Sequence, residues 1–95
     1  MFKISFVETP TQRRMVLEGK LISPWTAEVT TAWREAAQHL QGRKLIVDLS
    51  NVTLISVDGE NTLFELMNEG ASFFCCGVLT KHVVQKLARK LRCKA

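Results

Sequence analysis

A chain of 95 residues, of which 46% are hydrophobic and 23% charged, has the composition of one folded domain and is too short for two. This composition excludes a disordered or low-complexity chain, and no segment approaches the roughly 20 apolar residues that a membrane-spanning helix needs. The formal net charge of +4 originates in residues 78–95, which contain several cations and no acid. The N-terminal residues lack the apolar run of a signal peptide, so we expect a single cytoplasmic domain over residues 1–95.

The first predicted elements are two strands that pair as a hairpin. Apolar and polar residues alternate over residues 2–7 and again, less strictly, over residues 14–21, which is the period of a β-strand. Thr9–Pro10–Thr11 interrupts the alternation and predicts a turn. The short separation favours antiparallel pairing of the two strands.

An amphipathic helix is predicted next. Ser23 suits its N-cap and Pro24 its first helical position. Apolar residues then recur at three- and four-residue spacing as far as Leu40, with charged residues off that stripe. Gly42 is well placed as the C-terminal stop.

The second half alternates strands with helices. Residues 45–49 are an apolar run typical of a strand covered on both faces, and we expect residues 50–59 to form a loop after it. A helix ending at Gly70, a buried strand over residues 71–76 and a third helix over about residues 80–92 complete the chain.

The resulting order is β-β-α-β-α-β-α, which predicts an α/β domain. Its sheet should be four-stranded, mixed and mostly parallel, and covered by three helices. Ligands and partners of such open sheets usually meet the carboxyl ends of the strands. The loop over residues 50–59 is therefore the predicted functional region.

Three motifs in this order resemble the STAS family, the fold of anti-sigma-factor antagonists. The strand ending Val16–Leu21 is similar to the family's hydrophobic-x-Gly-x-Leu, and Asp48-Leu49-Ser50 to its Asp-Leu-Ser. Ile55–Gly59 lies where the family has Asp-Ser-Ser-Gly opening a helix. The resemblance extends over about residues 1–92, and it implies a regulatory protein-binding module without catalysis or cofactor. In well-known members a kinase that also binds a sigma factor phosphorylates the second Ser of that motif.

The sequence departs from this pattern at the phosphorylation motif. Aligned on Gly59, the phosphoacceptor becomes Asp58, the Ser before it Val57, and the Asp before that Ser56. The chain also ends before the final short strand and helix that many members carry. Asp58 therefore has two interpretations: a helix N-cap, or a permanent partial imitation of phosphoserine with about half the charge.

Neighbouring polar residues also have competing interpretations. Ser56 is either a displaced phosphoacceptor or a side chain that satisfies a local backbone group. Asp48 and Ser50 are expected to hold the loop in shape. The predicted partner-binding residues are Ser50, Asn51, Ser56, Val57, Asp58, Gly59 and Glu60, with Asp48 structuring the loop.

No catalytic or metal site is predicted. Neither His39 nor His82 has a partner at ligand spacing, and we expect Cys75 and Cys76 to be small, reduced core residues on opposite faces of a strand. The basic outer face of the last helix lacks interleaved aromatics, which makes an acidic protein a better partner for it than nucleic acid.

Two functions remain open. The domain either docks on an anti-sigma factor or a related kinase-like ATPase, or it is a small cytoplasmic subunit of a phospholipid-transporting ABC transporter. The missing phosphoacceptor favours the second hypothesis, while the Asp-Leu-Ser motif is compatible with both.

Overall fold

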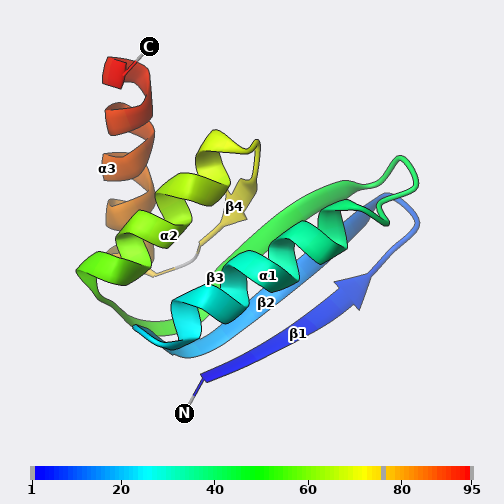
Figure 1. Cartoon of the computed structure of the whole chain (residues 1–95), viewed down its shortest axis with the longest axis horizontal. Coiled ribbons are helices and arrows are strands. Elements are labelled where there is room, and N and C mark those ends of the chain that lie inside the picture. The colour runs from blue at the N-terminus through cyan, green and yellow to red at the C-terminus, as the bar shows by residue number, and fades with distance from the viewer. Residues whose placement is uncertain (1, 76, 95) are drawn as a thin grey trace.

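The computed structural model describes residues 2–75 and 77–94, and the elements follow in the predicted order (Figure 1). They are strands β1 (Phe2–Glu8), β2 (Gln12–Leu21), β3 (Lys44–Ile55) and β4 (Ser72–Phe74), and helices α1 (Trp25–Ala37), α2 (Val57–Asn68) and α3 (Val78–Lys94). The sheet order is β1-β2-β3-β4, with β1 antiparallel to β2 and the other pairs parallel. The predicted mixed, mostly parallel sheet with three helices is confirmed.

The strand order never reverses, and this determines which face of the sheet the helices cover. Right-handed crossovers from β2 to β3 and from β3 to β4 move in one direction, so α1 and α2 lie on the same face. Figure 1 shows both helices in front of the sheet and α3 beside α2. A sheet without a reversal lacks the switch-point crevice where many open α/β sheets bind ligands, so partners must meet helix ends or surfaces.

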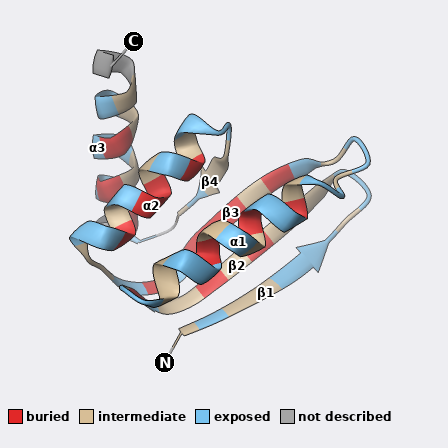
Figure 2. Cartoon of the chain, in the orientation of Figure 1, coloured by how far each residue is buried: buried red, intermediate tan, exposed pale blue. Residues whose placement is uncertain are grey.

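The core lies between the sheet and the helices (Figure 2). Its fully buried side chains come from β2, β3, α1 and α2: Met15, Leu17, Leu21, Val29, Val47, Leu49, Leu63 and Leu66. The prediction that residues 45–49 are covered on both faces is wrong. Ile46, on the face away from the helices, is only half-buried, while Asp48 on that face is buried by its strand neighbours.

β3 is longer than the sequence predicted. Residues 50–55 continue the strand instead of forming a loop, because β2 extends to Leu21 and pairs with this segment at Asn51, Val52, Leu54 and Ile55. Asn51 lies opposite Glu18 and Ile55 opposite Leu21, with register shifts on the way. The loop before α2 is therefore reduced to Ser56.

Several boundaries also differ. Pro24 occupies the cap position of α1 and makes no side-chain cap hydrogen bond, so Ser23 is not its N-cap. The helix ends at Ala37, and Gly42, with a φ of 82°, lies in the turn before β3.

The strand predicted over residues 71–76 is present as β4, but it has only three residues, lies at the edge of the sheet and is not buried. Cys75 follows it as a half-buried free thiol, whereas Cys76 lies outside the described residues.

Candidate functional site

The first turn of α2 is fastened to the end of β2. The Ser56 hydroxyl accepts a hydrogen bond from the Gly59 N–H at 3.1 Å and donates one to the Leu21 carbonyl at 3.4 Å. The Ser56 N–H also donates to the Leu21 carbonyl, at 3.1 Å. Ser56 is thus the N-cap of α2, as a local hydrogen-bonding role for its side chain predicted. The interpretation of Asp58 as the N-cap is wrong, because Val57 and Asp58 already belong to the helix.

Gly59 allows α2 to approach the sheet this closely. A Cβ at this position would overlap with the Leu21 carbonyl oxygen and lie 3.1 Å from an Ile55 methyl carbon. Gly59 is buried and therefore positions the helix start; it presents no side chain to a partner.

The side chains around this helix start point outward. Val57 is 73% exposed and Leu54, near the end of β3, is 47% exposed, while Asp58 is exposed as well. Glu60 is half-buried, and its carboxylate pairs with the Lys86 ammonium of α3 at 2.8 Å. We call Leu54, Val57, Asp58 and Glu60 the α2 tip: two exposed apolar residues beside two carboxylates at a helix N-terminus, where negative charge is favourable.

Two members of this region were missed at the sequence level. The sequence pattern predicts Leu54 in a loop, whereas it lies near the end of β3. Extending the strand pattern beyond residue 49 would have placed it there. Lys86 belongs to α3, and no local pattern links it to Glu60, 26 positions earlier.

Ser50 and Asn51 are not part of the tip. Both lie within β3, and Ser50 is six positions before Ser56, roughly 20 Å along an extended strand. The structure therefore does not bring the predicted partner-binding residues together as one surface.

Asp48 organises the helix-free face of the sheet instead of a loop. Its carboxylate accepts hydrogen bonds from the Ser50 N–H, at 2.9 Å, and from the Ser50 hydroxyl. It also lies 3.6 Å from an Arg14 Nη, and that guanidinium is stacked over the Phe74 ring. The prediction that Asp48 structures a loop is therefore wrong: its hydrogen bonds to Ser50 lie within β3, at some distance from the α2 tip.

Three further features were predicted from the sequence: the absence of a metal site, the absence of a membrane-spanning helix and a basic last helix. Among residues 2–75 and 77–94, no group of three His, Cys, Asp or Glu side chains lies close enough to hold a metal ion. Nor is any helix in this part of the chain long and apolar enough to cross a membrane. On α3, Lys81 and Arg89 are exposed, whereas Lys86 pairs with Glu60 and Lys90 lies over the Phe64 ring.

Comparison with solved structures identifies the architecture. No protein-family model matches the sequence, and no curated protein matches it. The structure is similar to the crystal structure of an anti-sigma-factor antagonist, a STAS domain from Rhodobacter sphaeroides, with a TM-score of 0.57 and 16% identity over 80% of this chain and 86% of that one. This chain has the STAS fold. In this chain the carboxyl ends of β2 and β3 lie next to the N-terminus of α2, and the α2 tip is the exposed part of this end of the domain.

Proposed function

We propose that the domain is a non-enzymatic regulatory module that docks on a cytoplasmic protein through the α2 tip, and that its partner is an anti-sigma factor or a related kinase-like ATPase. The observation that carries the proposal is the 73% exposure of Val57 on a rigidly capped helix start. Exposed apolar side chains next to charges are typical of the centre and rim of protein interfaces.

Asp58 is the residue of the α2 tip that would set the affinity for the kinase-like partner. It occupies the position of the phosphoacceptor in the resembling family, and its carboxylate is exposed in the first turn of α2. A fixed carboxylate supplies part of the charge of a phosphate and cannot be removed by a phosphatase. The domain would then be held permanently near the modified state, which in the family binds the kinase weakly.

Substituting Asp58→Ser tests this role. We expect about tenfold tighter binding to the kinase-like partner and an unchanged melting temperature, because Ser56 supplies the helix cap. Titration calorimetry measures the affinity, and Glu65→Gln, which neutralises an exposed acid two turns further along α2, is the matched control. Equal affinity of the Asp58→Ser and parent proteins would remove position 58 from the interface.

The identity of the partner is tested by affinity capture from the native cytoplasm followed by mass spectrometry. We expect the parent chain to retain a kinase-like ATPase and the Val57→Ser variant to lose it. Val7→Ser provides the control, since Val7 is 52% exposed at the other edge of the sheet. Recovery of RNA alone, or equal capture by the Val57→Ser variant, would reject the proposal.

A second candidate is a subunit of a phospholipid-transporting ABC transporter. It is favoured by the carboxylate at position 58, which a kinase and phosphatase pair cannot switch. In this case the same capture experiment returns a transporter ATPase. Asp58→Ser is then not expected to tighten binding, because Asp58 does not imitate a phosphorylated state. Neighbouring genes for an ATPase and a permease would support this alternative, whereas genes for a kinase-like ATPase and a sigma factor would support the first.

A further inference from the structure

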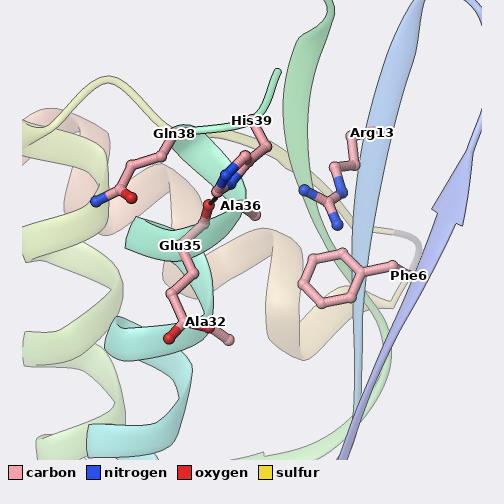
Figure 3. Close-up of a pocket in the computed structure, with 7 residues that line it drawn as sticks. All are labelled: Phe6, Arg13, Ala32, Glu35, Ala36, Gln38 and His39. Carbon is pink, nitrogen blue, oxygen red and sulfur yellow. Dashed lines mark hydrogen bonds between the residues drawn. The ribbon is translucent and has the colours of Figure 1, made fainter. Parts of the chain in front are cut away.

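A hollow lies at the end of the sheet opposite the α2 tip. α1 runs back towards the start of β2, and between its last two turns and the strands is a cavity of about 470 Å³. Phe6 of β1 and Arg13 of β2 form one wall of the cavity, and Ala32, Ala36 and His39 form the other (Figure 3). Its volume is within the range of small-molecule sites.

Arg13 is the unexplained group in this hollow. Its guanidinium lies 4.7 Å from the centre of the Phe6 ring, which holds it in place. Its Nε is sealed from solvent, yet among the described residues it has no hydrogen-bond partner, since the nearest Glu8 oxygen is 3.6 Å away. Because the Nε is sealed, a ligand in the hollow would meet the rest of the guanidinium, which points into the space between β2 and α1 (Figure 3).

The neighbouring Arg43 shows the contrast. Its Nη1 donates to Glu8 at 2.9 Å, and its Nε and Nη2 donate to the carbonyls of Leu40 and His39. Arg43 therefore uses its donors on the protein, whereas Arg13 has no hydrogen bond within the described part of the chain.

On the strand side of the hollow, positive charge exceeds negative charge, whereas Glu35 carries a carboxylate on its helix side. Two guanidiniums share the single carboxylate of Glu8. The hydrogen bond from Arg43, followed by the charge of Arg13, holds the pKa of Glu8 below its usual value of 4.5, so this carboxylate is ionised at neutral pH. An anion on the strand side would interact with the guanidinium of Arg13 and would have to lie away from the carboxylate of Glu35.

A second, more apolar hollow continues from the first. It has a volume of about 390 Å³ and lies between β1 and α1. It is lined by Ile4 of β1 and by Ala27, Glu28, Thr31, Ala32 and Glu35 of α1. Ala32 and Glu35 belong to both hollows, so the two are continuous along one face of α1. Glu35 lies at their junction and Glu28 lines the second hollow, so the negative charge of a ligand is accommodated only at the Arg13 end, and a second negative charge is disfavoured.

We propose that this groove binds an amphipathic monocarboxylate, with the carboxylate on the guanidinium of Arg13 and the apolar chain along Ala32 and Ile4 between β1 and α1. A planar carboxylate matches the two-pronged donor geometry of arginine. The apolar walls remove a short hydrocarbon chain from water. This site is at the opposite end of the sheet from the α2 tip, so it does not depend on the proposed docking function.

The test uses the full chain labelled with ¹⁵N and titrated with octanoate, followed by NMR. We expect saturable shifts of the amides of β1 and the second half of α1. Octylamine should bind poorly because its charge repels Arg13, acetate because it lacks the chain, and inorganic phosphate because it lacks the chain and Glu35 opposes its second charge. Arg13→Gln should weaken octanoate binding by about tenfold, the loss typical of a charge-assisted hydrogen bond.

Arg34→Gln is the matched control, because it removes the same charge from an exposed position on α1 outside the groove and should leave octanoate binding unchanged. Ala32→Leu provides a second route if Arg13→Gln perturbs the fold, since filling the junction should also weaken octanoate without touching the charge. The proposal is overturned if octanoate does not bind, if octylamine binds equally well, or if the folded Arg13→Gln and Ala32→Leu variants retain full affinity.

Discussion

The two ends of the sheet are built in opposite ways. At the carboxyl ends of β2 and β3, backbone packs on backbone: Gly59 lies under the Leu21 carbonyl, and the Ser56 hydroxyl hydrogen-bonds in both directions. At the start of β2, the space between strand and helix is hollow, and Arg13 makes no hydrogen bond to any described residue. A tightly packed end suits the proposed docking of a large partner on outward side chains, whereas a hollow end suits the proposed small ligand.

The largest expected difference between the two ends is in their tolerance of added side-chain atoms. We expect Gly59→Ala to lower the free energy of unfolding by about 2 kcal/mol or more, because the methyl group meets a fixed carbonyl. The higher helix propensity of alanine, about 1 kcal/mol, is too small to compensate. Ala32→Leu at the hollow end should change the free energy of unfolding by less than about 1 kcal/mol, since the added atoms enter open space. Urea unfolding measures both values, and similar losses for the two variants would refute this contrast.

A smaller effect is expected from the cap that fastens the tight end. Ser56→Ala removes the acceptor for the Gly59 N–H and should cost about 1 kcal/mol of unfolding free energy. Ser23→Ala is the control, because Ser23 is exposed and α1 has no side-chain cap hydrogen bond. Equal stability of the Ser56→Ala and Ser23→Ala proteins in the same urea assay would mean that the cap does not hold α2.

The smallest expected effect on stability comes from two exposed ion pairs, those of Glu8 and Glu69, the first of which borders the hollow end. Hydrogen bonds from Arg43 to Glu8 and from Arg34 to Glu69 lower the pKa values of both carboxyls from 4.5. Their contribution to stability is therefore complete above pH 4.5 and is lost as the pH falls through the lowered values in the folded state. Both groups are exposed, so solvent screens the effect.

We expect Glu8→Gln and Glu69→Gln to make the melting temperature less sensitive to acid below about pH 4.5. Glu28→Gln, at an exposed residue of α1 without an ion pair to any described residue, should leave that sensitivity unchanged. Thermal unfolding followed by circular dichroism provides the measurement. A parallel acid profile for all three variants would show that the pairs are too screened to matter.

The sequence by itself determined the order of elements and the class of fold. Alternation in the first strands and the three- and four-residue spacing in the helices are local patterns. The elements they predict are confirmed, because their buried stripes face one core. Gly70 was correctly placed just after the second helix, where its φ is positive, whereas Gly42 lies in the turn before β3, five positions beyond the end of α1. The similarity to STAS motifs led to the α2 start because that motif is contiguous along the chain.

Only the tertiary structure decided which residues lie at the start of α2 and which residue caps it. β3 continues to Ile55 because β2 lies alongside it, and this separates Ser50 and Asn51 from the tip. The cap is Ser56 instead of Asp58 because the Leu21 carbonyl, 35 positions earlier, receives its hydrogen bonds.

The groove at Arg13 likewise depends on contacts that no local pattern contains. It is formed by β1, β2 and α1, and even Arg13 and Ala32 on its opposite walls are 19 positions apart in the chain. Periodicity indicates which side of an element is buried, but it does not indicate what packs against that side. Register, close backbone approach and unfilled space arise only when distant segments meet, and these features determine both surfaces of this domain.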